Sequence, residues 1–361
     1  MSFCMPVYKK PDFQSEQFAD CPDAVVLPVH KAGVAPANFH ATTIFPEYFK
    51  IAGQWKLLTE SRMDGVVVLH PDGSLEVREF RRLMPGDRVV VGRTEDGSEG
   101  IYVHPDGFYQ DCEETDAFAF RTGRSRETSY SRDYDRLYEL MRHEKKNGYI
   151  VWVLGPAVVF DSDSKKAMIA LIENGYVDAI LAGNALATHD LEGVFFKTAL
   201  GQDIYTQTSV PNGHYHHLDV LNHAREHESL AEFITAKKVD DGIVAACVKA
   251  KVPLVLAGSI RDDGPLPEVV ADVYAAQNAM RRQAKKATTV ICLATQLHSI
   301  ATGNMTPAYQ VRDGEVRPVF IYSVDVSEFA VNKLKDRGTL EVTSIITNIQ
   351  DFLVHIQRGL A

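Results

Sequence analysis

The feature that most constrains this chain is a series of short apolar runs in its second half, none of which alternates with polar residues. Small or polar residues follow each run, and stretches with a helical pattern separate them; the runs are Tyr149–Val153, Ala179–Ala182, Val252–Leu256, Thr289–Leu293 and Phe320–Val324. A strand that is apolar on both faces must be covered on both faces, as in a parallel sheet flanked by helices. The sequence therefore predicts a parallel α/β domain over residues 133–361.

The first third of the chain has a different pattern. Short Val-rich segments alternate with turns rich in Pro, Asp and Gly, and the expected strands are Val66–Leu69, Leu75–Arg78, Arg88–Gly92 and Gly100–Val103. Strands this short and this closely spaced indicate a small antiparallel β module over residues 49–132. Residues 1–48 carry six prolines and little periodicity, so we expect an extended N-terminal arm there.

Charge and composition exclude several classes of function. The chain has 361 residues and a formal net charge of −10, so counterion release from a phosphate backbone would not favour binding, and nucleic acid is not expected as a partner. The longest uncharged apolar stretch, about 12 residues from Tyr149, is shorter than the roughly 20 that a membrane span needs. Because the five cysteines are scattered without a CxxC pair and no signal-peptide pattern opens the chain, we expect a cytoplasmic protein without a disulfide framework.

Small and polar residues gather where the predicted parallel strands end. Ligands of parallel sheets bind at the carboxyl ends of the strands, so these residues are candidates for contacting a nucleotide cofactor. They are Gly155, Pro156, Ala157, Gly183, Asn184, Ala185, Ser259, Asp262, Ala294, Thr295, Leu297, His298, Ser299 and Asp325. An acid at Asp325 would suit an adenine ribose and repel a 2′-phosphate, which favours NAD over NADP. The structural alternatives are a strand-to-helix turn at Gly155, helix caps at Asn184 and Asp325, and a structural imidazole at His298.

Two places offer proton carriers. His189 and Asp190 directly follow Gly183-Asn184, so we expect them near the cofactor as a general acid/base pair, with Asp190 accepting the proton of a substrate ammonium. Asp263 is a third candidate, because one of the adjacent carboxyls Asp262 and Asp263 would titrate upward if buried. The structural alternatives are a helix cap for Asp190 and a type I turn for the two adjacent aspartates.

Five of the 13 histidines lie between His214 and His227. A metal site is one interpretation, but HExxH is absent, cysteine ligands are missing, and the adjacent His216 and His217 do not easily share one face. We therefore favour a loop that closes over a substrate carboxylate, with His214, His216 and His217 as substrate contacts, and we expect no metal.

These motifs together resemble one known family. Its members are the C-terminal region of the ArgZ/AgrE-type arginine dihydrolases, the archaeal-type NAD-dependent ornithine cyclodeaminases, and the conserved region of lysine-ketoglutarate reductase/saccharopine dehydrogenase. The segments that carry the resemblance are Ser61–Gly65, Gly155–Val159, Gly183–Glu192, Gly213–His217, Ser259–Pro267, Leu293–Asn304, Val324-Asp325 and Lys333–Gly338, within roughly residues 36–360. The chain departs from the family pattern at Gln296, where a Met is expected, and at Phe160-Asp161, where His-Thr is expected.

The resemblance implies a Rossmann-like fold that holds NAD and converts ornithine, or a close analogue, to proline. In that reaction oxidation at Cα gives an imine, the distal amine attacks it, ammonia leaves, and the cyclic imine is reduced again, so NAD is not consumed. The resemblance also implies substrate contacts for Arg62 and Asn184, and a homodimer or homotetramer. Arginine hydrolysis is not expected, because the guanidine-hydrolysing module of the dihydrolases is not represented.

Two other functions stay open on the sequence alone. One is an NAD-dependent amino-acid or opine dehydrogenase that releases NADH. The other is a non-catalytic, regulatory NAD-binding module in which the β module contacts a partner.

Overall fold

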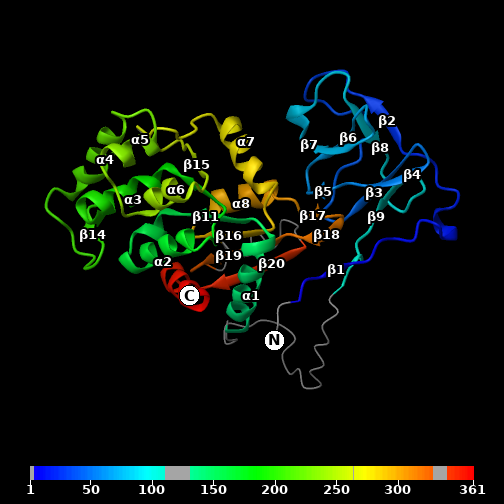
Figure 1. Ribbon diagram of the computed structural model, residues 1–361. Coiled ribbons are helices and arrows are strands. Elements are labelled where there is room, and N and C mark those ends of the chain that lie inside the picture. Colours follow the sequence, from blue (N-terminus) through cyan, green and yellow to red (C-terminus); the bar gives the residue numbers. More distant parts are fainter. Residues whose placement is uncertain (1–3, 110–130, 263, 328–339) are drawn as a thin grey trace.

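The computed structural model describes residues 4–109, 131–262, 264–327 and 340–361 and has two parts (Figure 1). A β-rich part, coloured blue to cyan, lies to one side of an α/β part that the rest of the chain forms. The α/β part contains a six-stranded parallel sheet, and the β-rich part contains small antiparallel sheets. The fold class predicted from the sequence is therefore confirmed.

The central sheet has the strand order β15-β12-β11-β16-β19-β20, and every neighbouring pair is parallel. The strands are β11 (Ile150–Leu154), β12 (Ala179–Gly183), β15 (Leu254–Ala257), β16 (Thr289–Leu293), β19 (Phe320–Asp325) and β20 (Glu341–Ile346). Numbered along the chain, they stand in the order 3-2-1-4-5-6, which is the order of the dinucleotide-binding Rossmann fold. The first five correspond to the five apolar runs of the sequence.

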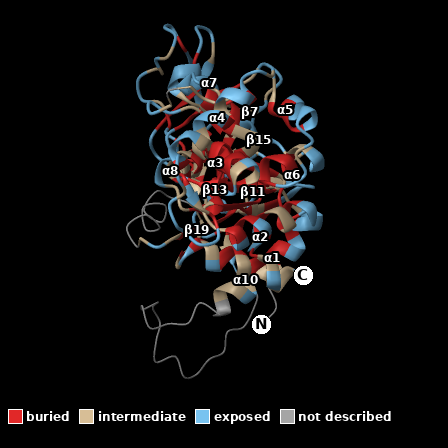
Figure 2. Ribbon diagram, turned by 90° about the vertical axis from the view of Figure 1, so that its left-hand side faces the viewer, coloured by how far each residue is buried: buried red, intermediate tan, exposed pale blue. Residues whose placement is uncertain are grey.

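Helices cover both faces of this sheet because successive side chains of each strand point to opposite sides. Trp152 and Leu154 pack in one core with residues of α1, α2 and α10, whereas Val151 and Val153 pack in a second core with residues of α7. The helices are α1 (Ser131–Asn147), α2 (Ser162–Glu173), α3 (Asn184–Phe196), α4 (His216–Ala224), α5 (Leu230–Ala236), α6 (Ile243–Ala250), α7 (Val273–Ala284), α8 (Gln296–Met305) and α10 (Ile349–Leu360). The buried residues accordingly form a layer between exposed outer helix faces (Figure 2).

The β-rich part consists of short strands held in several small antiparallel sheets. Its strands are β1 (Val7–Tyr8), β2 (Val25–Pro28), β3 (Glu47–Ile51), β4 (Gln54–Leu57), β5 (Glu60–Ser61), β6 (Val66–Leu69), β7 (Leu75–Arg78), β8 (Arg88–Val91), β9 (Ile101–Val103) and β10 (Phe108–Tyr109). The four strands expected from the sequence are present as β6 to β9. The expected N-terminal arm contributes strands of its own, because β1 pairs with β10 and β2 pairs with β8.

A hairpin from the α/β part joins the two parts. It consists of β17 (Tyr309–Arg312) and β18 (Glu315–Pro318), and β17 also pairs with β5. Ion pairs reinforce the junction: Arg62 and the Nε of Arg281 on α7 both contact Glu79, and Lys285 contacts Glu60. Because Arg62 and Arg281 are almost completely buried, this junction is part of the folded core and not a loose linker.

Two further observations bear on the expected environment of the protein. Among the described residues, no helix is long and apolar enough to cross a membrane. Cys4 is disulfide-bonded, whereas Cys21, Cys247 and Cys292 are free. The bond at Cys4 was not expected, because spacing along a chain does not report which thiols the fold brings together.

Candidate active site

The carboxyl edge of the sheet has a switch point between β11 and β16. From β11 the chain winds outward through β12 to β15 and then returns to the other side of β11 as β16. In such sheets the crevice at the reversal is where ligands bind. Gly155 directly follows β11 there, and its N–H donates to the carbonyl of Leu293 at 2.8 Å. A Cβ on Gly155 would lie 2.0 Å from the carbonyl oxygen of Ala294, so only glycine fits between these strand ends.

The neighbouring strand end is held in an uncommon backbone conformation. Ala294 directly follows β16 and has a φ of 47°, in the left-handed region that side chains other than glycine rarely adopt. Strained backbone of this kind concentrates at ligand-binding sites. The candidate residues Gly155 and Ala294 are therefore brought together at the switch point, as the strand-end interpretation expects.

The helix N-termini that follow the strands of the central sheet differ in how they are capped. Asp161, Asp272 and Asn348 cap α2, α7 and α10 with their side chains. In contrast, α3 and α8, which follow the two strands beside β11, have no side-chain cap. Uncapped N–H groups and the positive end of the helix dipole suit a phosphate group. The two helix starts next to Gly155 thus fit the diphosphate of a dinucleotide.

The departure at Asp161 has a structural explanation. Its carboxylate accepts hydrogen bonds from the N–H groups of Asp163 and Ser164 at 3.1 and 2.9 Å, and so it caps α2. The side chain is therefore committed to its own helix start.

The loops that follow β12, β15 and β16 contact one another. His298 on α8 lies against Gly183, where an added Cβ would be 3.0 Å from its ring. Burial lowers the pKa of His298, and nearby Asp262 opposes this shift only in part, so the imidazole is neutral near pH 7. The side-chain carbonyl of Asn184 accepts the N–H of Leu266 at 3.0 Å, which ties the loop after β15 to the start of α3.

The remaining strand-end candidates have varied environments. Asp262 accepts the N–H of Ser259 at 2.8 Å and closes a local turn, while Asp263 lies outside the described residues. Leu297 is 77% exposed, whereas Ser299 is buried on the inner side of the same helix. Pro156 and Ala157 form the short 3-10 helix η3 (Pro156–Val159) after Gly155; Ala185 and Thr295 are half-buried at the helix starts.

Asp325 stands at a different place from the ribose-binding acid of the usual Rossmann arrangement. That acid follows the second strand, which here is β12 and ends in Gly183 without a carboxylate. Asp325 ends β19, two strands from β11 on the opposite side, and its carboxylate accepts the N–H of Ser327 at 2.9 Å. A ribose contact at Asp325 therefore stays a prediction.

A histidine cluster, formed by His189, His216 and His217, lies around α3, next to the segment that follows β11. The ring of His189 is 5.6 Å from that of Phe160 and 6.1 Å from that of His217. His189 Nδ1 is 2.7 Å from a carboxylate oxygen of Glu192, one turn further along α3. The sequence interpretation did not select Glu192, although its spacing of three residues from His189 on a helix was the available signal.

Asp190 is placed differently from the expectation. The helix begins at Asn184, so Asp190 lies in its second turn, and its side chain is completely buried. One carboxylate oxygen accepts the N–H of Val244 at 2.8 Å and caps the start of α6, and the other is 3.1 Å from Nζ of Lys165. The carboxylate of Asp190 thus faces α2 and α6 inside the protein and does not contact Glu192, the partner of His189.

The expected substrate contacts fall in two separate places. His216 begins α4, stacks on Phe196 with ring centroids 4.3 Å apart, and has Nδ1 2.8 Å from the hydroxyl of Thr198. His214 is exposed against Tyr215. Arg62 is held in the junction by Glu79, in contacts that connect it to α7 and not to the histidine cluster. No group of three or more candidate metal ligands occurs among the described residues.

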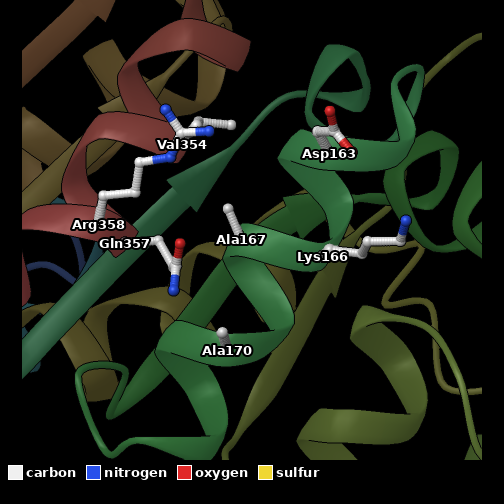
Figure 3. A pocket seen from close by; sticks show the side chains of 7 residues that line it. All are labelled: Asp163, Lys166, Ala167, Ala170, Val354, Gln357 and Arg358. Carbon is white, nitrogen blue, oxygen red and sulfur yellow. The ribbon is translucent and has the colours of Figure 1, made fainter. Parts of the chain in front are cut away.

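A groove lies apart from all of these residues. It has a volume of about 380 Å³ between α2 and α10 and is lined by Asp163, Lys166, Ala167, Ala170, Val354, Gln357 and Arg358 (Figure 3). None of the candidate site residues lines it. The strand ends and the histidine cluster are therefore the better candidate for a site of chemistry.

Comparison with known proteins places these features in context. A family model for the C-terminal, Rossmann-fold region of ArgZ-like arginine dihydrolases matches residues 136–356. The ornithine cyclodeaminase of Methanocaldococcus jannaschii is 38% identical over 335 residues, which are 90% of this chain and 75% of that protein. The bifunctional arginine dihydrolase/ornithine cyclodeaminase AgrE of Nostoc is 35% identical over 336 residues, which are 92% of this chain and 46% of that protein.

Solved structures of similar proteins agree with the sequence comparisons. A conserved LOR/SDH protein from Methanococcus maripaludis superposes with a TM-score of 0.83 and 33% identity, covering 94% of this chain and 98% of that one. The ternary complex of AgrE with ornithine and NAD+ has a TM-score of 0.59 and 33% identity, covering 94% of this chain and 46% of that one. Because these matches cover more than nine-tenths of the chain, they include the β module as well as the α/β part.

Proposed function

The chain belongs to the family of ornithine cyclodeaminases and ArgZ-like C-terminal regions, and we propose that it is an NAD-dependent ornithine cyclodeaminase. The reaction converts ornithine to proline and releases ammonia. The archaeal relatives bear this activity in their names, and one structural neighbour is a complex with ornithine and NAD+.

The observation that carries the proposal is the arrangement at the switch point. Gly155 admits no side chain, and the uncapped starts of α3 and α8 stand on either side of it. We propose that these three elements hold the diphosphate of NAD, with Asn184 and His298 fixing the loops around it. NAD supplies, when bound, a reversible two-electron acceptor for the Cα of the substrate.

The chain's own residues have to move protons. Ornithine enters with two ammonium groups, and each nitrogen must lose a proton before it takes part in imine formation or ring closure. We assign one of these transfers to His189, because it lies on α3 beside Phe160 and is held by a buried carboxylate. His214 and His217 are proposed to contact the substrate carboxylate, and Asp263 is kept as an alternative proton carrier.

The proposal is tested by incubating the purified protein with ornithine and NAD. We expect proline and ammonia in equal amounts, with no lasting rise of the nicotinamide absorbance. NADH that accumulates in step with the loss of ornithine would indicate a dehydrogenase instead. NAD release on denaturation without turnover of any diamino acid would indicate the binding module.

Replacement of His189 gives a second test. His189→Gln should lower turnover by roughly 10²–10⁴, the usual contribution of a positioned acid or base, while NAD binding is retained. His143→Gln is a matched control, because the side chain of His143 is 41% exposed on α1, outside the candidate site. Near-native turnover of the His189 variant would contradict the assignment.

A further inference from the structure

One buried carboxylate organises the histidine cluster. Glu192 is completely buried and accepts hydrogen bonds from the hydroxyl of Thr198 at 2.8 Å, the N–H of Gly201 at 3.0 Å and the N–H of Leu200 at 3.2 Å. Its fourth neighbour is Nδ1 of His189 at 2.7 Å. Burial alone would raise the pKa of Glu192, but the hydrogen bonds from His189, Gly201 and Thr198 together lower it. The side chain is therefore a carboxylate near pH 7.

An ionised carboxylate determines the tautomer of His189. A carboxylate only accepts hydrogen bonds, so the ring nitrogen that faces it must carry the proton. In the neutral imidazole of His189 the proton is then on Nδ1, and Nε2 has the free lone pair. Within the described parts of the chain, that Nε2 has no hydrogen-bond partner and is not fully buried. It is free to accept a proton.

The same carboxylate determines the tautomer of His216 through Thr198. A hydroxyl has one hydrogen, and Thr198 donates it to Glu192. Toward Nδ1 of His216, 2.8 Å away, the hydroxyl oxygen can only accept, so that nitrogen must carry the ring proton. Nε2 of His216 is then also left with its lone pair, and stacking on Phe196 holds the ring in place.

We propose that Glu192 is a positioning residue that sets the tautomers of His189 and His216 together, so that each imidazole presents a basic Nε2 to a substrate with two ammonium groups. This inference rests on the proposed function and deepens it. Each Nε2 accepts one proton from one ammonium group, which gives a free amine and an imidazolium. The conversion of ornithine to proline and ammonium consumes no net proton. The two imidazolium groups therefore return their protons, one to the departing ammonia and one to the nitrogen of the newly formed proline.

Glu192→Gln is the direct test, because the amide keeps the shape of the carboxylate and replaces one acceptor by a donor. If its NH2 group faces His189, Nδ1 of that ring must become an acceptor, and the proton moves to Nε2. If the NH2 group faces Thr198, the hydroxyl turns toward His216 and inverts the tautomer of that ring instead. Either orientation removes one of the two bases.

The first readout needs no substrate. Proton–nitrogen correlation spectra of the imidazole rings, assigned with His189→Gln and His216→Gln, report which nitrogen carries the proton. We expect Nδ1–H at both rings in the native protein and Nε2–H at one of them in Glu192→Gln. In turnover, the same variant should lose roughly 10²-fold or more in kcat, with KM and NAD affinity nearly unchanged.

Thr198 provides a second variant that leaves Glu192 in place. Thr198→Val should release His216 alone and keep the tautomer of His189, and Thr198→Ser should restore both the tautomer and the turnover. These variants keep the proposal testable if Glu192→Gln does not fold. Glu232→Gln is the matched control, because Glu232 is an exposed carboxylate 3.6 Å from Nδ1 of His227, outside the cluster, and turnover should not change.

The outcomes separate this inference from the proposed function. Turnover of ornithine by a native protein whose two rings carry Nε2–H would overturn the positioning role and leave the function standing. A native protein with Nδ1–H at both rings and no turnover of ornithine would refute the function and leave the tautomer assignment standing. Equal loss of kcat in Thr198→Val and Thr198→Ser would also overturn the inference, because it would indicate a packing effect.

Discussion

Asp190 is predicted to stabilise the fold, and replacing it with Asn separates this role from a catalytic one. The carboxylate caps α6 through the N–H of Val244 and faces Nζ of Lys165 at 3.1 Å. Asn at this position still offers a carbonyl oxygen to Val244, so the cap is retained. What Asp190→Asn removes is the negative charge that compensates the ammonium of Lys165.

The expected cost follows from the burial of both partners. The side chains of Lys165 and Asp190 are 5% and 0% exposed, so solvent screens the pair very little. Removing one partner of a buried pair leaves an uncompensated charge and costs about 3–5 kcal/mol. Losing a cap alone would cost only about 1 kcal/mol. We therefore expect Asp190→Asn to lower the free energy of unfolding by several kcal/mol, with turnover of the protein that remains folded nearly intact.

The assay is urea unfolding of single and double variants, with turnover measured below the unfolding transition. Lys165→Met should also destabilise the protein, but the double variant should lose less stability than the sum of the two single changes. Asp272→Asn is the matched control, because Asp272 is an exposed cap of α7 with no ion pair in the described structure. An Asp190→Asn protein with native stability and little turnover would refute this reasoning and restore Asp190 as a proton carrier.

Three further predictions concern the switch point, the pH dependence and the junction between the two parts. Gly155→Ala should abolish NAD binding measured by calorimetry, because its Cβ would meet the carbonyl oxygen of Ala294 at 2.0 Å. Burial lowers the pKa of His298 below its usual 6.5, so on acidification the unfolded chain binds a proton at this residue before the folded protein does. The free energy of unfolding should therefore fall as the pH drops below 6.5, and His298→Gln should reduce that fall in urea titrations. Glu79→Gln should lower the thermal unfolding temperature, because two buried arginines lose their carboxylate at a cost of about 3–5 kcal/mol; an unchanged temperature would contradict the role of this cluster.

The parallel sheet is predictable from the sequence because its inner strands are buried on both faces and leave no polar alternation. β11 and β16 are buried along their whole length, and each coincides with an apolar run. β20 lacks such a run, and all but one of its residues are partly exposed at one edge of the sheet. The hairpin β17–β18 has a local signal in its two-residue turn Asp313-Gly314, but its pairing with β5, more than 200 residues away, is not predictable from the sequence.

The candidate site is predictable in part for the same reason. Strand-end residues are brought together by any parallel sheet, so Gly155 lies against Ala294 and Gly183 lies against His298. Arg62 is different, because its motif carries no information on which partners the fold will give it, and it lies in an ion-pair cluster with Glu79. The sequence also does not reveal a residue that lies on one helix and caps a different one, as Asp190 on α3 caps α6.

The partner of His189 follows from helix geometry once the start of the helix is known. Successive residues of an α-helix are rotated by about 100°, so His189 and Asp190 point to different sides, whereas residues three apart lie on one face. Because α3 begins at Asn184, this rule directs Asp190 into the core toward Lys165 and gives His189 the carboxylate of Glu192. The sequence pattern suggests that His189 and Asp190 act as one pair because they are adjacent. In the folded protein, Asp190 instead neutralises a buried lysine, and Glu192 orients the imidazole of His189. The comparison of Asp190→Asn with Glu192→Gln tests this division, since the first change should act on stability and the second on turnover.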